Sequence, residues 1–154
     1  MKTKSKAWVC NMRDRLFINL KYRDGMLKKW DEENILGIHM LETKDIFLLA
    51  TALGLNEPKD IDGKKDGYVR LSYIKTYQKS LLASILLGLE ENQEHVDKFA
   101  NAEVNYDEAE RCAEAGFLKL NEMIESAGGD MELLEKRIFS QLNMLYQKNV
   151  ASNL

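Results

Sequence analysis

The sequence contains a single proline, Pro58, in 154 residues. Proline lacks a backbone donor and ends or kinks helices, so a chain with only one imposes few stops on its helices. The length fits one domain that can bury a core. A hydrophobic content of 45% with 31% charged residues is typical of a globular protein. We therefore expect one mainly helical domain over residues 1–154, with residues 150–154 as a frayed tail.

Apolar residues recur at helical spacing in the first half of the chain. Thr43 is expected to cap a helix over residues 44–53, and Ser72 a helix that runs to about Gly88. The second of these is apolar on most sides, with Leu81, Leu82 and Leu86 among its members, which predicts a place in the centre of the fold. Residues 56–67 read as a polar loop with two Asp-Gly turns.

The second half of the chain predicts three more helices. A short one is expected over residues 93–101, and a long one over 106–126, ended by Gly128-Gly129. Asp130 is expected to cap a last helix over residues 131–149. The residues expected to face inward are Tyr106, Ala109, Ala113, Phe117, Leu120 and Ile124 in the long helix, and Met131, Leu134, Ile138, Leu142 and Leu145 in the last.

Residues 7–40 are compatible with two structures. Apolar residues alternate over positions 16–22 and are followed by Asp24-Gly25, a pattern that predicts a two-residue hairpin turn. Apolar residues at every fourth position from Trp8 to Leu20 predict a helix instead. The fold class is therefore mainly α, a compact bundle of about five helices, with or without a small N-terminal β-hairpin.

Charge is segregated along the chain. Residues 1–30 hold nine Lys/Arg and two Asp/Glu, while residues 90–135 hold three Lys/Arg and fourteen Asp/Glu. In the acidic part, helical spacing places four carboxylates on one face, which predicts a solvated outer face or a docking surface for a basic partner. They are Glu103, Asp107, Glu110 and Glu114.

The basic N-terminal segment, residues 1–30, interleaves cations with aromatic residues such as Trp8 and Phe17. This combination suits phosphate contact and base stacking, or else pairing with the acidic helix of the same chain. The candidate nucleic-acid contacts are Arg13, Arg15, Lys21, Arg23, Lys28 and Lys29.

No catalytic, cofactor-binding or metal-binding residues are predicted, and no cofactor. The only histidines, His39 and His95, have no second ligand at metal-binding spacing. The loop over residues 60–67 places Lys64 where a calcium loop needs an oxygen ligand, and it lacks the closing glutamate. The glycine-rich phosphate motifs and the Gly-x-Ser-x-Gly motif are missing from the sequence, which disfavours an enzyme.

The remaining features indicate a cytoplasmic protein. Cys10 and Cys112 lie far apart in unlike contexts and are expected to be free thiols. Charged residues interrupt the N-terminal segment before any apolar run, so no signal peptide is expected. The longest apolar stretch, residues 81–89, is too short to span a bilayer.

Three short segments carry a family resemblance. They are Asp45–Gly54, with the spacing Phe-x-x-Ala-x-x-x-Gly, then Asp66–Arg70, and Ala113–Leu120. Their order resembles small helical proteins associated with bacterial DNA phosphorothioation and related defence loci. The chain departs from that pattern at Glu114-Ala115 and in its basic N-terminal segment. The resemblance implies a genetic context rather than a mechanism, and it transfers no catalytic residue.

The sequence thus favours a non-enzymatic accessory or adaptor protein that acts through protein contacts, in a prokaryotic DNA-modification or defence system. Its candidate docking face is the acidic helix around residues 103–125. The alternative is a nucleic-acid-binding module that uses the basic segment. Opposite charges on two parts of one chain are also compatible with a homodimer.

Overall fold

The computed structural model describes residues 13–87 and 102–151. It confirms a mainly helical fold with a small antiparallel pair of strands. The elements in chain order are β1 (Arg15–Asn19), α1 (Leu20–Tyr22), the π-helical turn η1 (Arg23–Leu27), α2 (Lys28–Glu32), the 3₁₀ segment η2 (Ile35–Met40), α3 (Thr43–Leu53), β2 (Lys65–Arg70), the 3₁₀ turn η3 (Leu71–Tyr73), α4 (Thr76–Leu87), α7 (Ala102–Ala127) and α8 (Met131–Ala151).

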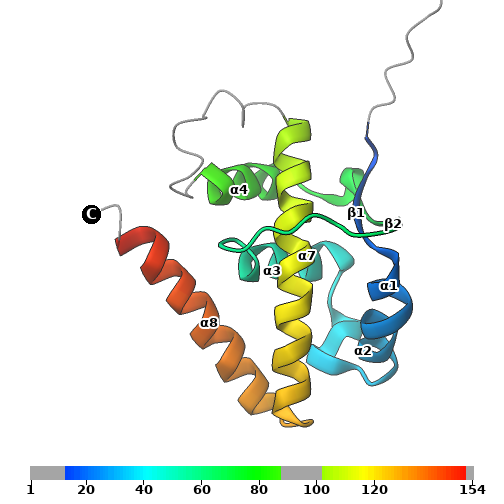
Figure 1. Cartoon of the computed structure of the whole chain (residues 1–154), viewed down its shortest axis with the longest axis vertical. Coiled ribbons are helices and arrows are strands. Elements are labelled where there is room, and N and C mark those ends of the chain that lie inside the picture. Colours follow the sequence, from blue (N-terminus) through cyan, green and yellow to red (C-terminus); the bar gives the residue numbers. More distant parts are fainter. Residues whose placement is uncertain (1–12, 88–101, 152–154) are drawn as a thin grey trace, which may run out of the picture.

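The longest helix, α7, forms the axis against which the other elements pack (Figure 1). All six residues predicted to face inward from it are buried, so that prediction is confirmed. The closest neighbour of α7 is α3, which packs against it through two glycines, Gly54 and Gly116. A Cβ atom on Gly116 would overlap the Ala50 carbonyl, and one on Gly54 would overlap the Cys112 carbonyl. The backbones of α3 and α7 are therefore in direct contact at positions where only glycine fits.

The first half of the chain differs from prediction at two helix starts. Helix α3 is capped by Glu42, whose backbone N–H donates to the Asp45 carboxylate at 3.2 Å, and not by Thr43. Helix α4 begins at Thr76 rather than after Ser72, because a 3₁₀ turn intervenes.

The prediction that α4 is buried on most sides is wrong at Leu81. Leu82 and Leu86 are buried, whereas Leu81 is 51% exposed. The central position belongs to α7, whose partner across the glycine contact is α3.

Residues 13–32 form a strand and then a helical run, so the helix predicted from the Trp8–Leu20 spacing is wrong over Arg15–Asn19. Strand β1 is followed without a break by a helical run over residues 20–32. The partner of β1 is β2, with Arg15 opposite Arg70 and Asn19 opposite Lys65. Asp24-Gly25 lies within the π-helical turn, so the prediction of a hairpin turn at this site is wrong. The predicted polar loop over 56–67 is also too long, because β2 begins at Lys65.

The C-terminal helix starts as predicted. Gly128 and Gly129 adopt positive φ angles of 59° and 88°, and the Asp130 carboxylate accepts from the Leu133 N–H at 3.0 Å. Leu134 and Leu145 are buried, whereas Met131, expected inside, is exposed. The helix α8 extends to Ala151, two residues past the predicted end. Residues 152–154 of the predicted tail and the predicted helix over 93–101 lie outside the described residues.

The glycine contact gives a stability prediction. We expect Gly116→Ala to destabilise the protein by more than about 3 kcal/mol, because the overpacked atoms are backbone and cannot move aside. The matched control is Gly25→Ala, in a helical turn with no atom within 4 Å of the added Cβ. That variant should be neutral or stabilising by up to about 1 kcal/mol. Urea unfolding measures both, and a Gly116→Ala variant as stable as the Gly25→Ala variant would disprove the close α3–α7 contact.

Candidate functional site

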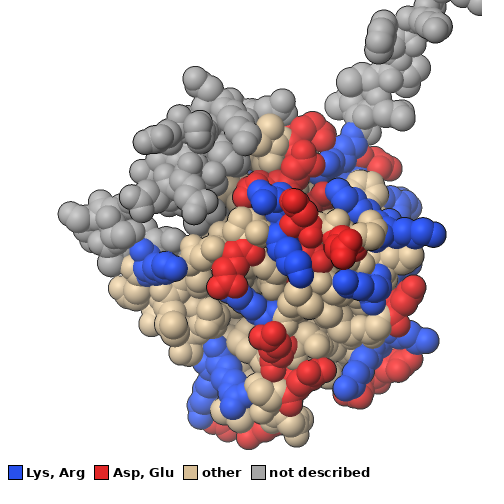
Figure 2. Space-filling view, in the orientation of Figure 1, with Lys and Arg blue, Asp and Glu red and all other residues tan. Residues whose placement is uncertain are grey.

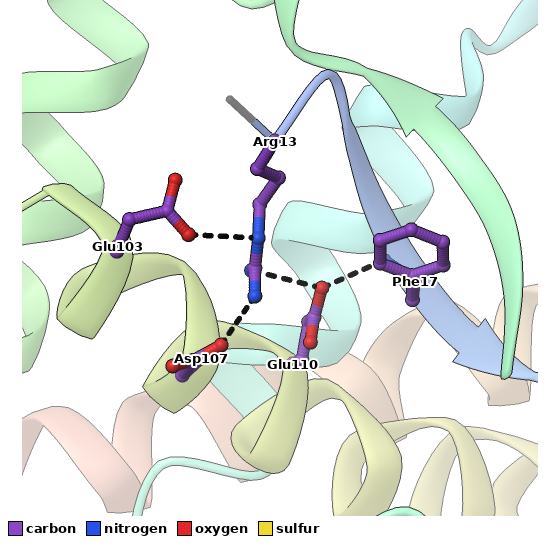
Figure 3. A network of polar contacts seen from close by, with 5 residues as sticks. All are labelled: Arg13, Phe17, Glu103, Asp107 and Glu110. Carbon is purple, nitrogen blue, oxygen red and sulfur yellow. Dashed lines mark hydrogen bonds and ion pairs between the residues drawn. The ribbon is translucent and has the colours of Figure 1, made fainter. Parts of the chain in front are cut away.

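The charges that are segregated along the sequence are interspersed on the folded surface (Figure 2). One reason is that residues 13–22 lie against the acidic helix α7. Arg13 lies at the centre of this contact and reaches three of the four predicted docking carboxylates (Figure 3). Its Nε lies 3.1 Å from Glu103 Oε2, its Nη1 lies 3.1 Å from Glu110 Oε1, and its Nη2 pairs with Asp107.

Glu110 connects this cluster to the backbone of β1. The residue is 2% exposed, and its Oε1 accepts both from Arg13 and from the Phe17 N–H, the latter at 2.8 Å. Burial raises the pKa of the Glu110 carboxyl above its ordinary value, while the Phe17 N–H and the Arg13 charge act in the opposite direction. A buried carboxylate is costly unless donors surround it, and here the N-terminal segment supplies them.

Glu114, one helical turn further along α7, is held by the same segment. It is 2% exposed, and its Oε1 accepts a hydrogen bond of 2.7 Å from the Tyr22 hydroxyl. Within the described residues its Oε2 has no hydrogen-bond partner. Burial and the neighbouring Glu114 charge raise the pKa of Tyr22 above its usual range, so this hydroxyl remains a donor.

The prediction of an acidic outer face on α7 is therefore wrong for Glu110 and Glu114, which lie inside the fold. Glu103 and Asp107 are exposed, but both are bonded to Arg13. The four carboxylates do share one face, and that face binds residues 13–22 of the same chain. Sequence reasoning listed this intrachain pairing as one alternative, but no signal in the sequence distinguishes it from an external partner.

The six candidate nucleic-acid contacts are dispersed over the described part of the chain. Arg13 lies beside the first turns of α7, whereas Lys29 lines a hollow at its far end with Ile124 and Gly128. At 1.5 Å per residue these two sites are roughly 30 Å apart, several Debye lengths at physiological salt. The local partners of the other four are Asp14 for Arg15, the Tyr22 ring for Lys21, Asp66 for Arg23 and Glu32 for Lys28.

A second surface, which sequence analysis missed, lies on η3 and α4. Tyr73, Tyr77 and Leu81 follow one another at four-residue spacing and are 60%, 64% and 51% exposed. We call these three residues the tyrosine face. Beside it, Tyr73 and the first turn of α3 line a hollow of about 440 Å³, in which Lys44 Nζ donates to the Tyr73 carbonyl at 3.3 Å. The four-residue spacing was visible in the sequence, but Leu81 was assigned to the core.

Within the described part of the chain, Cys112 is the one cysteine and His39 is the one histidine. Burial raises the pKa of the Cys112 thiol to about 12, so it stays protonated at neutral pH. His39 lies 2.7 Å from the Asp31 carbonyl and 3.3 Å from its carboxylate, on the surface. No three His, Cys, Asp or Glu side chains in residues 13–87 and 102–151 are grouped to hold a metal ion. In the same ranges, no helix combines the length and apolar character needed to cross a membrane.

Comparison with protein-family models, with curated proteins and with solved structures found no match for this chain.

The buried contact with α7 leads to a stability prediction. We expect Glu110→Ala to destabilise the protein by about 2–4 kcal/mol, because the Phe17 N–H and Arg13 lose a buried acceptor. The matched control is Glu103→Ala, which also removes one Arg13 contact but from a side chain that is 53% exposed. That change should cost less than about 1 kcal/mol. Urea unfolding compares them, and equal losses would contradict the buried role of Glu110.

Proposed function

We propose that this protein is a non-enzymatic accessory or adaptor protein that acts through contacts with another protein. The observation that carries the proposal is the exposure of the tyrosine face, in which Tyr77 and Leu81 lie one turn apart on α4 and Tyr73 lies on the preceding turn η3. Tyrosine is enriched at protein interfaces because it buries a large ring and keeps a hydroxyl for hydrogen bonding. Such residues dominate binding energy where they are desolvated together.

The charge around the tyrosine face favours a partner with an acidic surface. Residues 70–87 contain Arg70, Lys75 and Lys79 and no Asp or Glu. Lys44 adds a fourth cation beside Tyr73, although Glu42 pairs with it at 3.0 Å. Two copies of this chain would repel each other if they met through this region, whereas an acidic partner would be attracted. The docking face proposed here therefore replaces the acidic face of α7, which the chain itself occupies.

The resemblance to proteins of phosphorothioation and defence loci supports a partner within a prokaryotic DNA-modification or defence system. Nucleic acid is the less favoured partner, because the candidate cations of the described N-terminal residues have acidic or aromatic neighbours in the fold and lie far apart. A gel-shift titration at low salt provides the direct comparison.

The proposal is tested by affinity purification of the full chain from its native host. We expect one protein to co-purify with the wild type, and to be lost when Tyr73→Ser and Tyr77→Ser are combined, because the interface loses both rings. The matched control is Met144→Ser, which alters an exposed apolar residue on another helix. The control should retain the partner.

Two results would overturn the proposal. One is a chain recovered alone at low salt and native abundance. The other is a partner that is retained equally by the tyrosine variant and by the Met144→Ser control. Retention of nucleic acid instead of protein would favour the alternative function.

A further inference from the structure

We propose that the outer face of α8 is a self-association surface, on which two copies of this chain pair antiparallel about a twofold axis. The inference does not rest on the proposed function, since it concerns a different helix. The apolar residues of α8 extend beyond the side of the helix that the rest of the fold buries. Leu134 and Leu145 are buried, whereas Phe139 is 77% and Tyr146 is 60% exposed.

The exposed part of the stripe is a continuous strip along the helix. Phe139, Leu142 and Tyr146 are separated by three and four residues, so they lie on one side of α8. Leu142 is half-buried and joins this strip to the core. Figure 2 shows mostly uncharged atoms over the middle of α8 on the face that it draws. Exposed apolar strips of this kind mark interaction sites.

The charges on α8 favour a second copy of the chain as the partner and an antiparallel arrangement of the two helices. Four charged residues lie in the first two turns of α8, namely Glu132, Glu135, Lys136 and Arg137, whereas beyond Phe139 the helix carries one charge, Lys148 in its last turn. An antiparallel pair centred between Phe139 and Leu142 places the acidic first turns of each helix against the half of the other helix whose one charge is positive. Glu135 then lies opposite Tyr146 of the second copy, where its carboxylate can accept from the hydroxyl.

A parallel pair would be unfavourable by the same reasoning. It would bring Glu132 and Glu135 of one copy against the same residues of the other, and it would align the two helix dipoles. An antiparallel twofold arrangement also makes the surface self-complementary, as a closed dimer requires. The tyrosine face lacks this property, because residues 70–87 around it contain cations and no Asp or Glu.

The area is sufficient for a weak dimer. The exposed parts of Phe139 and Tyr146 together amount to roughly 270 Å² per copy, on the basis of 150–250 Å² for a fully buried aromatic side chain. With Leu142, the exposed Met131 and the flanking polar residues, the total for two copies approaches the roughly 1,000 Å² lower bound for a specific interface. We expect self-association that is no tighter than micromolar, because an interface near that lower bound has little area to offset the cost of association.

Sedimentation equilibrium of the purified full chain tests the proposal. We expect wild-type protein to be dimeric well above micromolar concentration, and Phe139→Ser to raise the dissociation constant by at least about thirtyfold, as for a central interface residue. Met144→Ser is the matched control, because Met144 is 62% exposed on α8 but lies off the strip. It should leave the dissociation constant within about threefold of wild type.

Two substitutions of Tyr146 test whether the two α8 helices pair antiparallel. In the antiparallel pair Tyr146→Lys faces Glu135 of the second copy and should preserve the dimer, whereas Tyr146→Glu faces the same carboxylate and should abolish it. Equal weakening by both would overturn the antiparallel arrangement.

Wild-type protein that stays monomeric at about 100 µM would overturn the self-association itself. The self-association would also be overturned if Met144→Ser weakened the dimer as much as Phe139→Ser. Because the measurement uses purified protein alone, its failure leaves the tyrosine face untouched. Loss of the host partner from the tyrosine variant likewise leaves the dimer untouched.

Discussion

Two buried carboxylates, Glu110 and Glu114, determine how the N-terminal part of the chain meets the rest of the fold. A carboxylate inside a protein is costly unless donors match it. The donors come from Arg13, the backbone of Phe17 and the hydroxyl of Tyr22. These contacts fix β1 and the start of the following helix against α7.

The aromatic core follows from that attachment. Once residues 13–22 lie along α7, Tyr22 and Trp30 each reach Phe117 with ring centroids 6.4 Å apart. Tyr68, on β2, approaches the same ring at 6.0 Å from the strand that pairs with β1. Tyr22 makes both kinds of contact to α7, because its hydroxyl donates to Glu114 and its ring packs near Phe117. Among the six candidate cations, Arg13 is the one that joins the basic and acidic parts of the described chain through ion pairs with α7.

The helices could be predicted from the sequence because their stability depends on local periodicity. The buried stripe of α7 and the Asp130 cap of α8 were both recognisable in this way. The burial of Glu110 was not, because it depends on donors more than ninety residues away in the chain. Helical spacing established that the four carboxylates share a face but not whether that face meets water or protein.

Two other differences have the same origin. The partner of β1 is a strand that begins at Lys65, so the two strands are far apart in the sequence. The Asp24-Gly25 pair predicted a local hairpin turn, but it lies in a helical turn. The run of apolar residues around Leu81 predicted a core position for it. In the structure Leu82 and Leu86 are buried, whereas Leu81 is exposed. The side of a strongly apolar helix that becomes buried depends on the elements that pack against it, and local sequence does not specify them.

The attachment of the N-terminal segment to α7 is tested most directly by hydrogen exchange at the Phe17 amide. This N–H donates to a buried side chain, Glu110, across the contact itself. The account predicts that it exchanges orders of magnitude more slowly than an unprotected amide, through openings that approach global unfolding in free energy. Exchange of the Phe17 amide at the unprotected rate, in a protein whose α7 core amides remain protected, would contradict it.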